Sequence, residues 1–284
     1  MAGVSSQMLT DEQFRRLSVF IHKEVGINVE TKKVLLEGRL RKRLHQLCIP
    51  TFGEYCQYLF SVEGQREELV YMIDAVATNK TDFFREPHQF EYLTQKALPA
   101  LAAGAGSCWK LCAWSAASST GEEPYTLGIV LSEYAAGQPG FDFSILATDI
   151  STKVLDHAVA GVYNHERVEP VPLALRKKYL LKSKDPSKKL VKIAPALQEK
   201  VAFRRLNLMD QTFGIADAMG VIFCRNVIIY FDKPTQTALI RKLFDQLMPG
   251  GYLFMGHSEV LNHIDLPLVS VAPSIYRKTG EAKK

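Results

Sequence analysis

Residues 113–125 read Ala113-Trp114-Ser115-Ala116-Ala117-Ser118-Ser119-Thr120-Gly121-Glu122-Glu123-Pro124-Tyr125. An apolar run ends at the start of this stretch, and small residues then lead directly into a helical pattern. Because small side chains leave the backbone open, a ligand can approach it closely here. The stretch therefore predicts the ligand-binding end of a strand–loop–helix unit.

Short apolar runs alternate with helical stretches from about residue 108 onward, which is typical of a parallel α/β sheet. The strand candidates are residues 109–114, 143–148, 220–224, 252–256 and 269–276. Helical periodicity falls between them, at about residues 122–136, 151–160 and 234–248. We therefore expect an α/β unit over residues 78–284.

A lysine-rich insert separates the second strand candidate from the third. Residues 176–205 hold eleven Lys and Arg against Asp185 and Glu199. Apolar and polar residues alternate over residues 190–193 and 201–204, which predicts a small antiparallel appendage at about residues 170–206. Its charge indicates either a surface for an acidic partner or a solvated hairpin.

The first 77 residues predict a small all-helical domain. Apolar residues recur at helical spacing over residues 10–25 and 31–47, a capping-box pattern at Thr51 starts a third helix, and a fourth is expected near residues 65–77. In the second helix six cations crowd residues 32–43, where only Glu37 opposes them. This basic face could contact an acidic partner or be solvated.

The composition excludes several classes of protein. The chain has 284 residues, 47% of them hydrophobic and 23% charged, with a net charge of +5, which does not fit a disordered chain, a collagen or a disulfide scaffold. The longest apolar stretch, residues 221–231, is interrupted by Arg225 and Asn226, so no membrane span is expected. The amino terminus has no signal-peptide pattern, so we expect a cytoplasmic protein. Neither the cysteine nor the histidine spacing predicts a metal site.

Asp149 lies at the end of the second strand candidate, in Thr148-Asp149-Ile150. An acidic residue at that place in a doubly wound fold typically accepts hydrogen bonds from the ribose hydroxyls of an adenosine. The chain has no GxGxxG and no Walker lysine motif, so no phosphate cradle is predicted. S-adenosylmethionine, which carries adenosine without phosphates, therefore fits best. Taken alone, Asp149 could equally cap the helix that begins near Ser151.

Four stretches together resemble the chemotaxis receptor methyltransferase family, CheR. They are Asn79-Lys80-Thr81-Asp82-Phe83-Phe84-Arg85-Glu86, residues 114–125, Phe223-Cys224-Arg225-Asn226-Val227-Ile228-Ile229-Tyr230-Phe231, and Pro249-Gly250-Gly251-Tyr252-Leu253-Phe254-Met255-Gly256-His257-Ser258-Glu259. The resemblance covers essentially the whole chain. It implies a Rossmann-like methyltransferase sheet, a small all-α N-terminal domain and an inserted antiparallel β-subdomain.

The resemblance also implies the reaction and its residues. The family transfers a methyl group from S-adenosylmethionine to glutamate side chains of bacterial chemoreceptors, giving γ-glutamyl methyl esters and S-adenosylhomocysteine, without a metal. The implied catalytic residues are Arg85 and Tyr230. The implied cofactor contacts are Asn79, Thr81, Arg85, Glu123, Asp149, Asn207, Leu208, Arg225 and Asn226.

Partners follow from the same resemblance. The basic helix, with Arg39, Arg41, Lys42 and Arg43, would face the cytoplasmic domain of a methyl-accepting receptor, and the β-subdomain could dock a receptor's C-terminal peptide. We expect a monomer that neither binds nucleic acid nor inserts into a membrane. Two of the residues have structural alternatives, because Glu123 could serve only the helix dipole and Tyr230 could be a core aromatic.

Methyl transfer to a glutamate needs few catalytic groups. A glutamate side chain has an ordinary pKa near 4.3 and is ionised at neutral pH, so no general base is required. The planar fork of Arg85 suits a carboxylate, either that of the cofactor or that of the substrate. One competing hypothesis is a non-catalytic S-adenosylmethionine-binding signalling or scaffold module. Another is a nucleic-acid methyltransferase, against which stands the absence of an Asn/Asp-Pro-Pro-Tyr/Phe motif.

Overall fold

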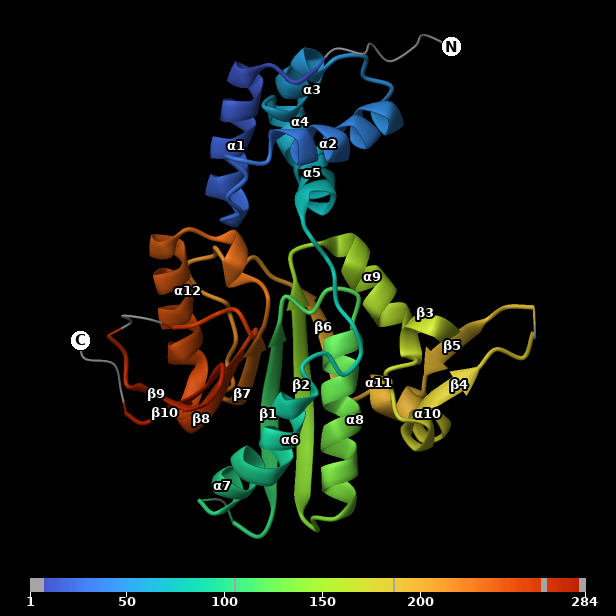
Figure 1. Cartoon of the computed structure of the whole chain (residues 1–284), viewed down its shortest axis with the longest axis vertical. Helices are drawn as coiled ribbons and strands as arrows, with labels where there is room; N and C mark the ends of the chain where they lie inside the picture. Colours follow the sequence, from blue (N-terminus) through green and yellow to red (C-terminus); the bar gives the residue numbers. More distant parts are fainter. Residues whose placement is uncertain (1–7, 105, 186, 262–264, 281–284) are drawn as a thin grey trace.

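The N-terminal helices lie at one end of a central sheet, at the edge toward which strands β1 and β2 point (Figure 1). The computed structural model describes residues 8–104, 106–185, 187–261 and 265–280. The N-terminal helices are α1 (Asp11–Val25), α2 (Lys33–Leu47), α3 (Phe52–Leu59), α4 (Val62–Glu67) and α5 (Leu69–Val76). An extended segment then leads to α6 (Pro87–Tyr92), the π-helix η1 (Leu93–Ala97) and α7 (Leu98–Ala102).

Local sequence signals explain where α1 begins and ends. The Thr10 hydroxyl accepts a hydrogen bond from the Gln13 N–H at 3.2 Å, and the Gln13 side chain accepts one from the Thr10 N–H at 3.0 Å. Gly26 ends the helix with a left-handed φ of 73°. A Cβ at Gly26 would be strained by this φ and would lie 2.6 Å from Met209 Sδ of the sheet domain, so a larger residue would have to displace the Met209 side chain.

The main sheet confirms the α/β prediction. Its strand order is β6-β2-β1-β7-β8-β10-β9, and all neighbours except the pairs that involve β10 are parallel. Its strands are β1 (Trp109–Ala116), β2 (Phe141–Asp149), β6 (Val201–Arg205), β7 (Met219–Cys224), β8 (Leu247–Met255), β9 (Leu268–Ala272) and β10 (Ile275–Lys278). The helices between them are α8 (Glu122–Ala136), α9 (Thr152–Ala160) and α12 (Lys233–Gln246), with a 3₁₀ turn η3 (Ile228–Tyr230).

Alternate residues of the central strands enter two separate hydrophobic cores. Val221 and Phe223 of β7 pack in the core that includes α6, α7 and α8, whereas Ile222 and Cys224 pack in the core that includes α12. Because side chains of a strand point alternately to opposite faces, both faces of the sheet are covered. The carboxyl ends of β1, β2 and β7 are thereby held together at the edge that faces the N-terminal helices (Figure 1).

A second, antiparallel sheet projects from the side of the domain (Figure 1). It has the order β3-β5-β4, and its elements are β3 (Val162–Asn164), the 3₁₀ helix η2 (His165–Val168), α10 (Leu173–Tyr179), β4 (Leu180–Lys182), β5 (Leu190–Ile193) and α11 (Pro195–Gln198). The predicted antiparallel appendage is present. The strand predicted at residues 201–204 is also present, but its assignment to the appendage was wrong, because Val201–Arg205 pairs in parallel with β2 as the edge of the main sheet.

Two further expectations were wrong in detail. The single helix expected near residues 65–77 is divided into α4 and α5 at Glu68, whose carboxylate turns into the core of the helical unit. The strand expected over residues 269–276 is a hairpin, because the chain reverses between β9 and β10 at Ser274, which has a left-handed φ of 58°. The described part of the chain contains no helix with the length and hydropathy of a membrane span.

We expect Glu68→Ala to reduce the free energy of unfolding by about 3 kcal/mol. The Glu68 side chain is 1% exposed, and it accepts hydrogen bonds from Arg43 Nη2 at 2.6 Å and from the Tyr55 hydroxyl at 3.0 Å. Its removal leaves the Arg43 guanidinium largely buried without a counter-charge. Urea denaturation measures the change. Glu67→Ala, at the exposed neighbouring position, is the control and should change stability by no more than about 0.5 kcal/mol; equal effects of both variants would contradict the prediction.

Candidate functional site

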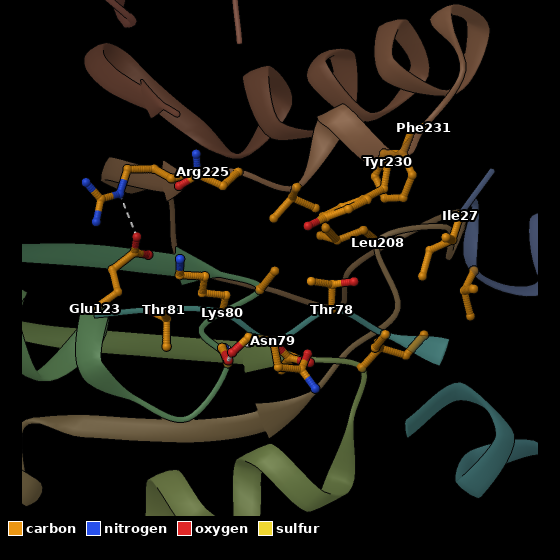
Figure 2. A pocket seen from close by; sticks show the side chains of 18 of the residues that line it. Ile27, Thr78, Asn79, Lys80, Thr81, Glu123, Leu208, Arg225, Tyr230 and Phe231 are labelled. Carbon is orange, nitrogen blue, oxygen red and sulfur yellow. Dashed lines mark hydrogen bonds and ion pairs between the residues drawn. The ribbon is translucent and has the colours of Figure 1, made fainter. Parts of the chain in front are cut away.

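A cleft lies at the carboxyl ends of β1, β2 and β7, between the sheet and the N-terminal helices (Figure 2). Ligands of open α/β sheets bind at this edge. Its lining residues are Val25, Ile27, Ala77, Thr78, Asn79, Lys80, Thr81, Arg85, Ala117, Ser119, Glu123, Asp149, Ile150, Leu206, Asn207, Leu208, Arg225, Asn226, Val227, Tyr230 and Phe231.

Every residue that the sequence nominated for the cofactor or for catalysis lines this cleft. The set comes from five separate parts of the chain, namely residues 79–85, Glu123, Asp149, residues 207–208, and residues 225–230. The four nominated docking residues on α2 do not line it. Proximity of the first set is a property of the fold, while the contact that each residue makes with a ligand stays a prediction.

Asp149 is fixed by the backbone around it. It is 6% exposed, its Oδ2 accepts a hydrogen bond from the Ser119 N–H at 2.8 Å, and its Oδ1 accepts one from the Ser151 N–H at 3.0 Å. The helix cap of α9 is made instead by the Ser151 hydroxyl, which accepts from the Val154 N–H. The alternative that Asp149 caps α9 is therefore wrong. The remaining lone pairs of its carboxylate can accept hydrogen bonds from the hydroxyl groups of a ligand.

Burial raises the pKa of Asp149 above the ordinary value for an aspartate. The backbone N–H groups of Ser151, Ser119 and Ile150 act in the opposite direction, and the nearby Asp74 carboxylate raises the pKa slightly further. None of these groups that affect the pKa of Asp149 is a cation. Ligand hydroxyl groups would thus replace the water that burial removes from the carboxylate.

Glu123 and Arg225 form a buried ion pair across the cleft, drawn as a dashed line in Figure 2. Arg225 Nε donates to Glu123 Oε2 at 2.6 Å, and the two side chains are 2% and 9% exposed. The Ser115 hydroxyl donates to the other Glu123 oxygen at 2.6 Å. Glu123 therefore does more than complement the dipole of α8, because it neutralises the guanidinium at the end of β7.

Arg85 has a different environment. Its Nη1 donates to the Lys80 carbonyl oxygen at 3.1 Å, and its own carbonyl oxygen accepts from Arg225 Nη1 at 2.7 Å. Among the described residues, no carboxylate forms an ion pair with Arg85. Its guanidinium is therefore held in place by a neutral group while its positive charge remains available to an anion.

The loop after α1 covers one end of the cleft, beside Tyr230. The Asn28 N–H donates to the Tyr230 carbonyl oxygen at 2.8 Å, and the Lys32 ammonium lies 5.5 Å from the centre of the Tyr230 ring. Tyr230 itself is partly exposed and lines the cleft. The alternative that Tyr230 is an ordinary core aromatic is therefore incomplete, although part of its ring packs against the core that includes α12.

The Asn207 side chain is held by two hydrogen bonds within the chain. Its Nδ2 donates to the Glu24 carbonyl oxygen at 2.7 Å, and its Oδ1 accepts from the Met209 N–H at 3.0 Å. One N–H and one lone pair of the amide remain for a ligand, beside the Leu208 side chain. The sequence analysis also missed the apolar wall made by Val25 and Ile27, since no local pattern shows that the end of α1 reaches the sheet.

Left-handed backbone is concentrated around the cleft. Of the seven non-glycine residues with positive φ in the described chain, Phe84, Glu86, Ala117, Ser119 and Asn226 belong to the segments that form it. Such conformations are unfavourable for residues with a Cβ and persist only where surrounding contacts impose them. Here they turn backbone N–H groups toward buried carboxylates, as at Ser119 and Asn226.

The predicted docking cluster on α2 is largely engaged within the chain. Arg39 donates to the carbonyl oxygens of Val76 and Ala77, Arg41 pairs with Glu37, and Arg43 pairs with buried Glu68. Lys42 is exposed, and no polar contact of its side chain is found among the described residues. Docking through this helix stays a prediction, and the contacts leave Lys42 as its most available charge.

The cleft suits a nucleoside-containing cation better than a nucleotide. A carboxylate at the end of β2 matches ribose hydroxyls, and apolar side chains from α1 and from residues 206–208 can cover a base. The described residues contain no cluster of three or more His, Cys, Asp or Glu side chains that could hold a metal ion. S-adenosylmethionine, with its adenosine, sulfonium and amino-acid groups, fits this set of donors and acceptors.

Comparison with known protein families agrees with this interpretation of the cleft. Residues 79–273 match the family model described as CheR methyltransferase, SAM binding domain, and residues 12–77 match the model described as CheR methyltransferase, all-alpha domain. The first of these spans every lining residue from Asn79 onward. S-adenosylmethionine is thus the cofactor of this domain.

Individual relatives are similar over nearly their whole length. Chemotaxis protein methyltransferase 2 of Pseudomonas aeruginosa is 39% identical over 94% of this chain and 93% of its own. The chemotaxis protein methyltransferase of Klebsiella aerogenes is 37% identical over 96% of this chain and 91% of its own, and that of Escherichia coli is 34% identical over 94% and 91%. These similarities extend across both the helical and the sheet domains.

We expect the affinity for S-adenosylmethionine to fall as the pH is lowered, with a midpoint above the ordinary aspartate pKa of about 3.9. Ribose hydroxyls donate more strongly to an ionised carboxylate than to a neutral acid, and burial raises the pKa of Asp149. Protonation on acidification therefore removes the preferred acceptor. Calorimetric titrations across pH measure the effect, and Asp149→Asn should bind weakly at every pH. A midpoint at or below the ordinary value in the unchanged protein would contradict the prediction.

Proposed function

The chain belongs to the CheR methyltransferase family, and from this premise we propose that it methylates glutamate side chains of bacterial chemoreceptors. The products would be γ-glutamyl methyl esters and S-adenosylhomocysteine. The observation that carries the proposal is the pairing, in one cleft, of a ribose-type carboxylate at Asp149 with an arginine at position 85 that has no acidic partner in the described chain. The first group suits the cofactor and the second suits a carboxylate.

The proposed mechanism relies on positioning. When bound, S-adenosylmethionine supplies an electrophilic methyl group on a sulfonium. Asp149 would hold the ribose end, while Arg85 would orient a carboxylate and Tyr230 would border the path to the methyl group. A receptor glutamate is already ionised near neutral pH, so no side chain of this protein has to remove a proton. Orientation of this kind can supply up to roughly 7–11 kcal/mol.

The proposal also assigns a role to each of the two domains. We propose an N-terminal helical domain over residues 1–77 and a catalytic domain over residues 78–284, a division supported by the separate family matches. Asn79, Thr81, Asn207, Leu208, Arg225 and Asn226 would complete the cofactor site. The helical domain would meet the receptor through α2, the antiparallel sheet would offer a second contact for a receptor tail, and a cytoplasmic monomer would suffice for both.

The test of this function is transfer of labelled methyl from S-adenosylmethionine to receptor-containing membranes, scored as methanol released by alkali. We expect alkali-labile label with the unchanged protein and a loss of at least about 100-fold with Asp149→Ala and with Arg85→Ala, since each removes a group that positions a reactant. Binding of the cofactor without label on any receptor in a panel would favour the non-catalytic signalling module. Label that resists alkali would contradict ester formation.

The same assay separates the two possible roles of Arg85. If its guanidinium holds the carboxylate of the cofactor, Arg85→Ala should mainly raise the KM for S-adenosylmethionine. If it aligns the receptor glutamate, the variant should mainly lower kcat. Arg85→Lys keeps the charge but loses the planar fork, so a large loss in this variant would indicate bidentate contact.

We expect Lys42→Glu to raise the KM for receptor about fivefold with kcat unchanged, because one exposed charge contact is worth about 1 kcal/mol or less. Lys42 is the docking residue without an internal partner in the described structure, so its substitution leaves the helical core intact. Initial rates over a range of receptor concentrations measure KM, and added salt should narrow the difference. Lys96→Glu, an exposed residue of η1, is the control. Equal effects of the two substitutions would argue against docking through α2.

A further inference from the structure

Glu259 is a buried carboxylate whose hydrogen-bond donors, among the described residues, are all backbone N–H groups. It is 2% exposed, and its Oε2 accepts hydrogen bonds from the N–H groups of Gly256 at 2.7 Å and Asn226 at 2.8 Å. Its Oε1 accepts from Val227 at 2.7 Å and, more weakly, from Ile229 at 3.4 Å. No ion pair joins Glu259 to a cation in the described chain. A charge buried in this way must be stabilised by those N–H dipoles.

These N–H groups belong to the loop that forms one wall of the cleft. Residues 225–230 follow β7 and carry Arg225, Asn226 and Tyr230, all of which line the cleft. Asn226 has a left-handed φ of 59°, which turns its N–H and that of Val227 toward the same point. Successive N–H groups arranged in this manner form an anion-binding concavity, and the carboxylate of Glu259 occupies it.

The hydrogen bonds of Glu259 also join the ends of two strands. Gly256 directly follows β8, and Asn226 lies two residues after the end of β7, so Glu259 Oε2 bridges the ends of neighbouring strands. There is almost no free space at this junction, because a Cβ at Gly256 would lie 2.7 Å from both Glu259 Oε2 and Asn226 N. Such close contact leaves the loop little freedom to shift while the carboxylate stays in place.

We propose that Glu259 is a positioning residue for methyl transfer, which holds the Asn226–Tyr230 loop at the methyl end of the cofactor site. This inference rests on the proposed function. Glu259 does not line the cleft, so it acts through the loop and not on a reactant. Asp149 lies on a different strand and is fixed by other N–H groups, so the adenosine end of the site does not depend on Glu259.

The required chemistry is that of a carboxylate with two acceptor oxygens. Glu259→Gln replaces one oxygen by an NH₂ group, which would face N–H donors instead of accepting from them. Glu259→Asp keeps both oxygens but is shorter by one methylene group. We therefore expect kcat to fall about 100-fold in Glu259→Gln and about tenfold in Glu259→Asp, since a displacement near 1 Å can cost that much in an oriented reaction.

The experiment measures kcat at saturating receptor and cofactor, the Kd of S-adenosylmethionine by calorimetry, and the thermal midpoint of each variant. The Kd is expected to rise no more than about tenfold, less than the fall in kcat, because Asn226 is one of several cofactor contacts and those around Asp149 are held by other N–H groups. Leu131→Ala, which opens a cavity at a fully buried position of α8 away from the loop, is the control for lost stability and should keep its kcat. A kcat in Glu259→Gln equal to that of this control would overturn the proposal, as would an affinity loss as large as the loss of kcat.

Amide hydrogen exchange in the complex with S-adenosylhomocysteine gives a readout that does not need turnover. Exchange at Asn226 and Val227 should accelerate at least about tenfold in Glu259→Gln while exchange at Ser119 and Ser151, around Asp149, stays unchanged. Unchanged exchange at the loop would overturn the proposal. If the unchanged protein transferred no methyl group, the proposed function would be contradicted. Faster exchange in Glu259→Gln would then still support Glu259 as the residue that holds this loop in place.

Discussion

The ion pair between Arg225 and Glu123 is the contact on which the rest of the site depends. Arg225 follows β7 directly and Glu123 lies in the first turn of α8, so their 2.6 Å contact fixes the end of one strand against the helix that follows another. Arg225 also donates to the Arg85 carbonyl oxygen, in the segment before α6, and to Gln89 Oε1, in α6 itself. Because an unpaired charge at this depth would be costly, the three segments can move only together.

Backbone N–H groups supply the remaining order. Asp149 and Glu259 are both buried carboxylates held by backbone N–H groups, and in each case one of the donors, Ser119 or Asn226, has a left-handed backbone. Burial raises the pKa of both carboxyl groups, while the N–H contacts oppose that effect. The two serve different ends of the cleft, since Asp149 keeps acceptor capacity for a ligand whereas Glu259 uses its oxygens on the loop itself. In the proposed site, the same kind of contact would thus hold both a ligand-binding carboxylate and a carboxylate that positions a loop.

Much of this arrangement could be predicted from the sequence because it is local. Short stretches of sequence predicted both the strand–loop–helix unit around residues 113–125 and the acidic end of β2. The structure contains both at the predicted positions. Long-range pairing was less visible. Val201–Arg205 alternates as an antiparallel strand would, yet it pairs in parallel with β2, and a half-buried edge strand shows the same alternation in either direction.

The site itself shows the same limit. The nominated residues do line one cleft, but the sequence could not show that Val25 and Ile27 of the helical domain complete its wall, or that Glu259 supports it. Nor could it show that Arg39, Arg41 and Arg43 are engaged within the helical domain. A run of cationic residues in a sequence does not show which side chains are paired in the folded chain. That depends on the carboxylates and carbonyl groups that folding brings near them.

The balance of charge in the cleft finally explains how an anionic nucleophile could be accepted without a base. Arg225 pairs with Glu123 at 2.6 Å and with Glu86 at 3.7 Å, whereas Arg85 forms no ion pair with a carboxylate in the described chain. An ionised glutamate approaching the cleft therefore meets a net attractive group, whereas a neutral side chain would have to displace water from Arg85 without compensation. In the proposed function, selection for a carboxylate and its orientation would then arise from the same contact with Arg85.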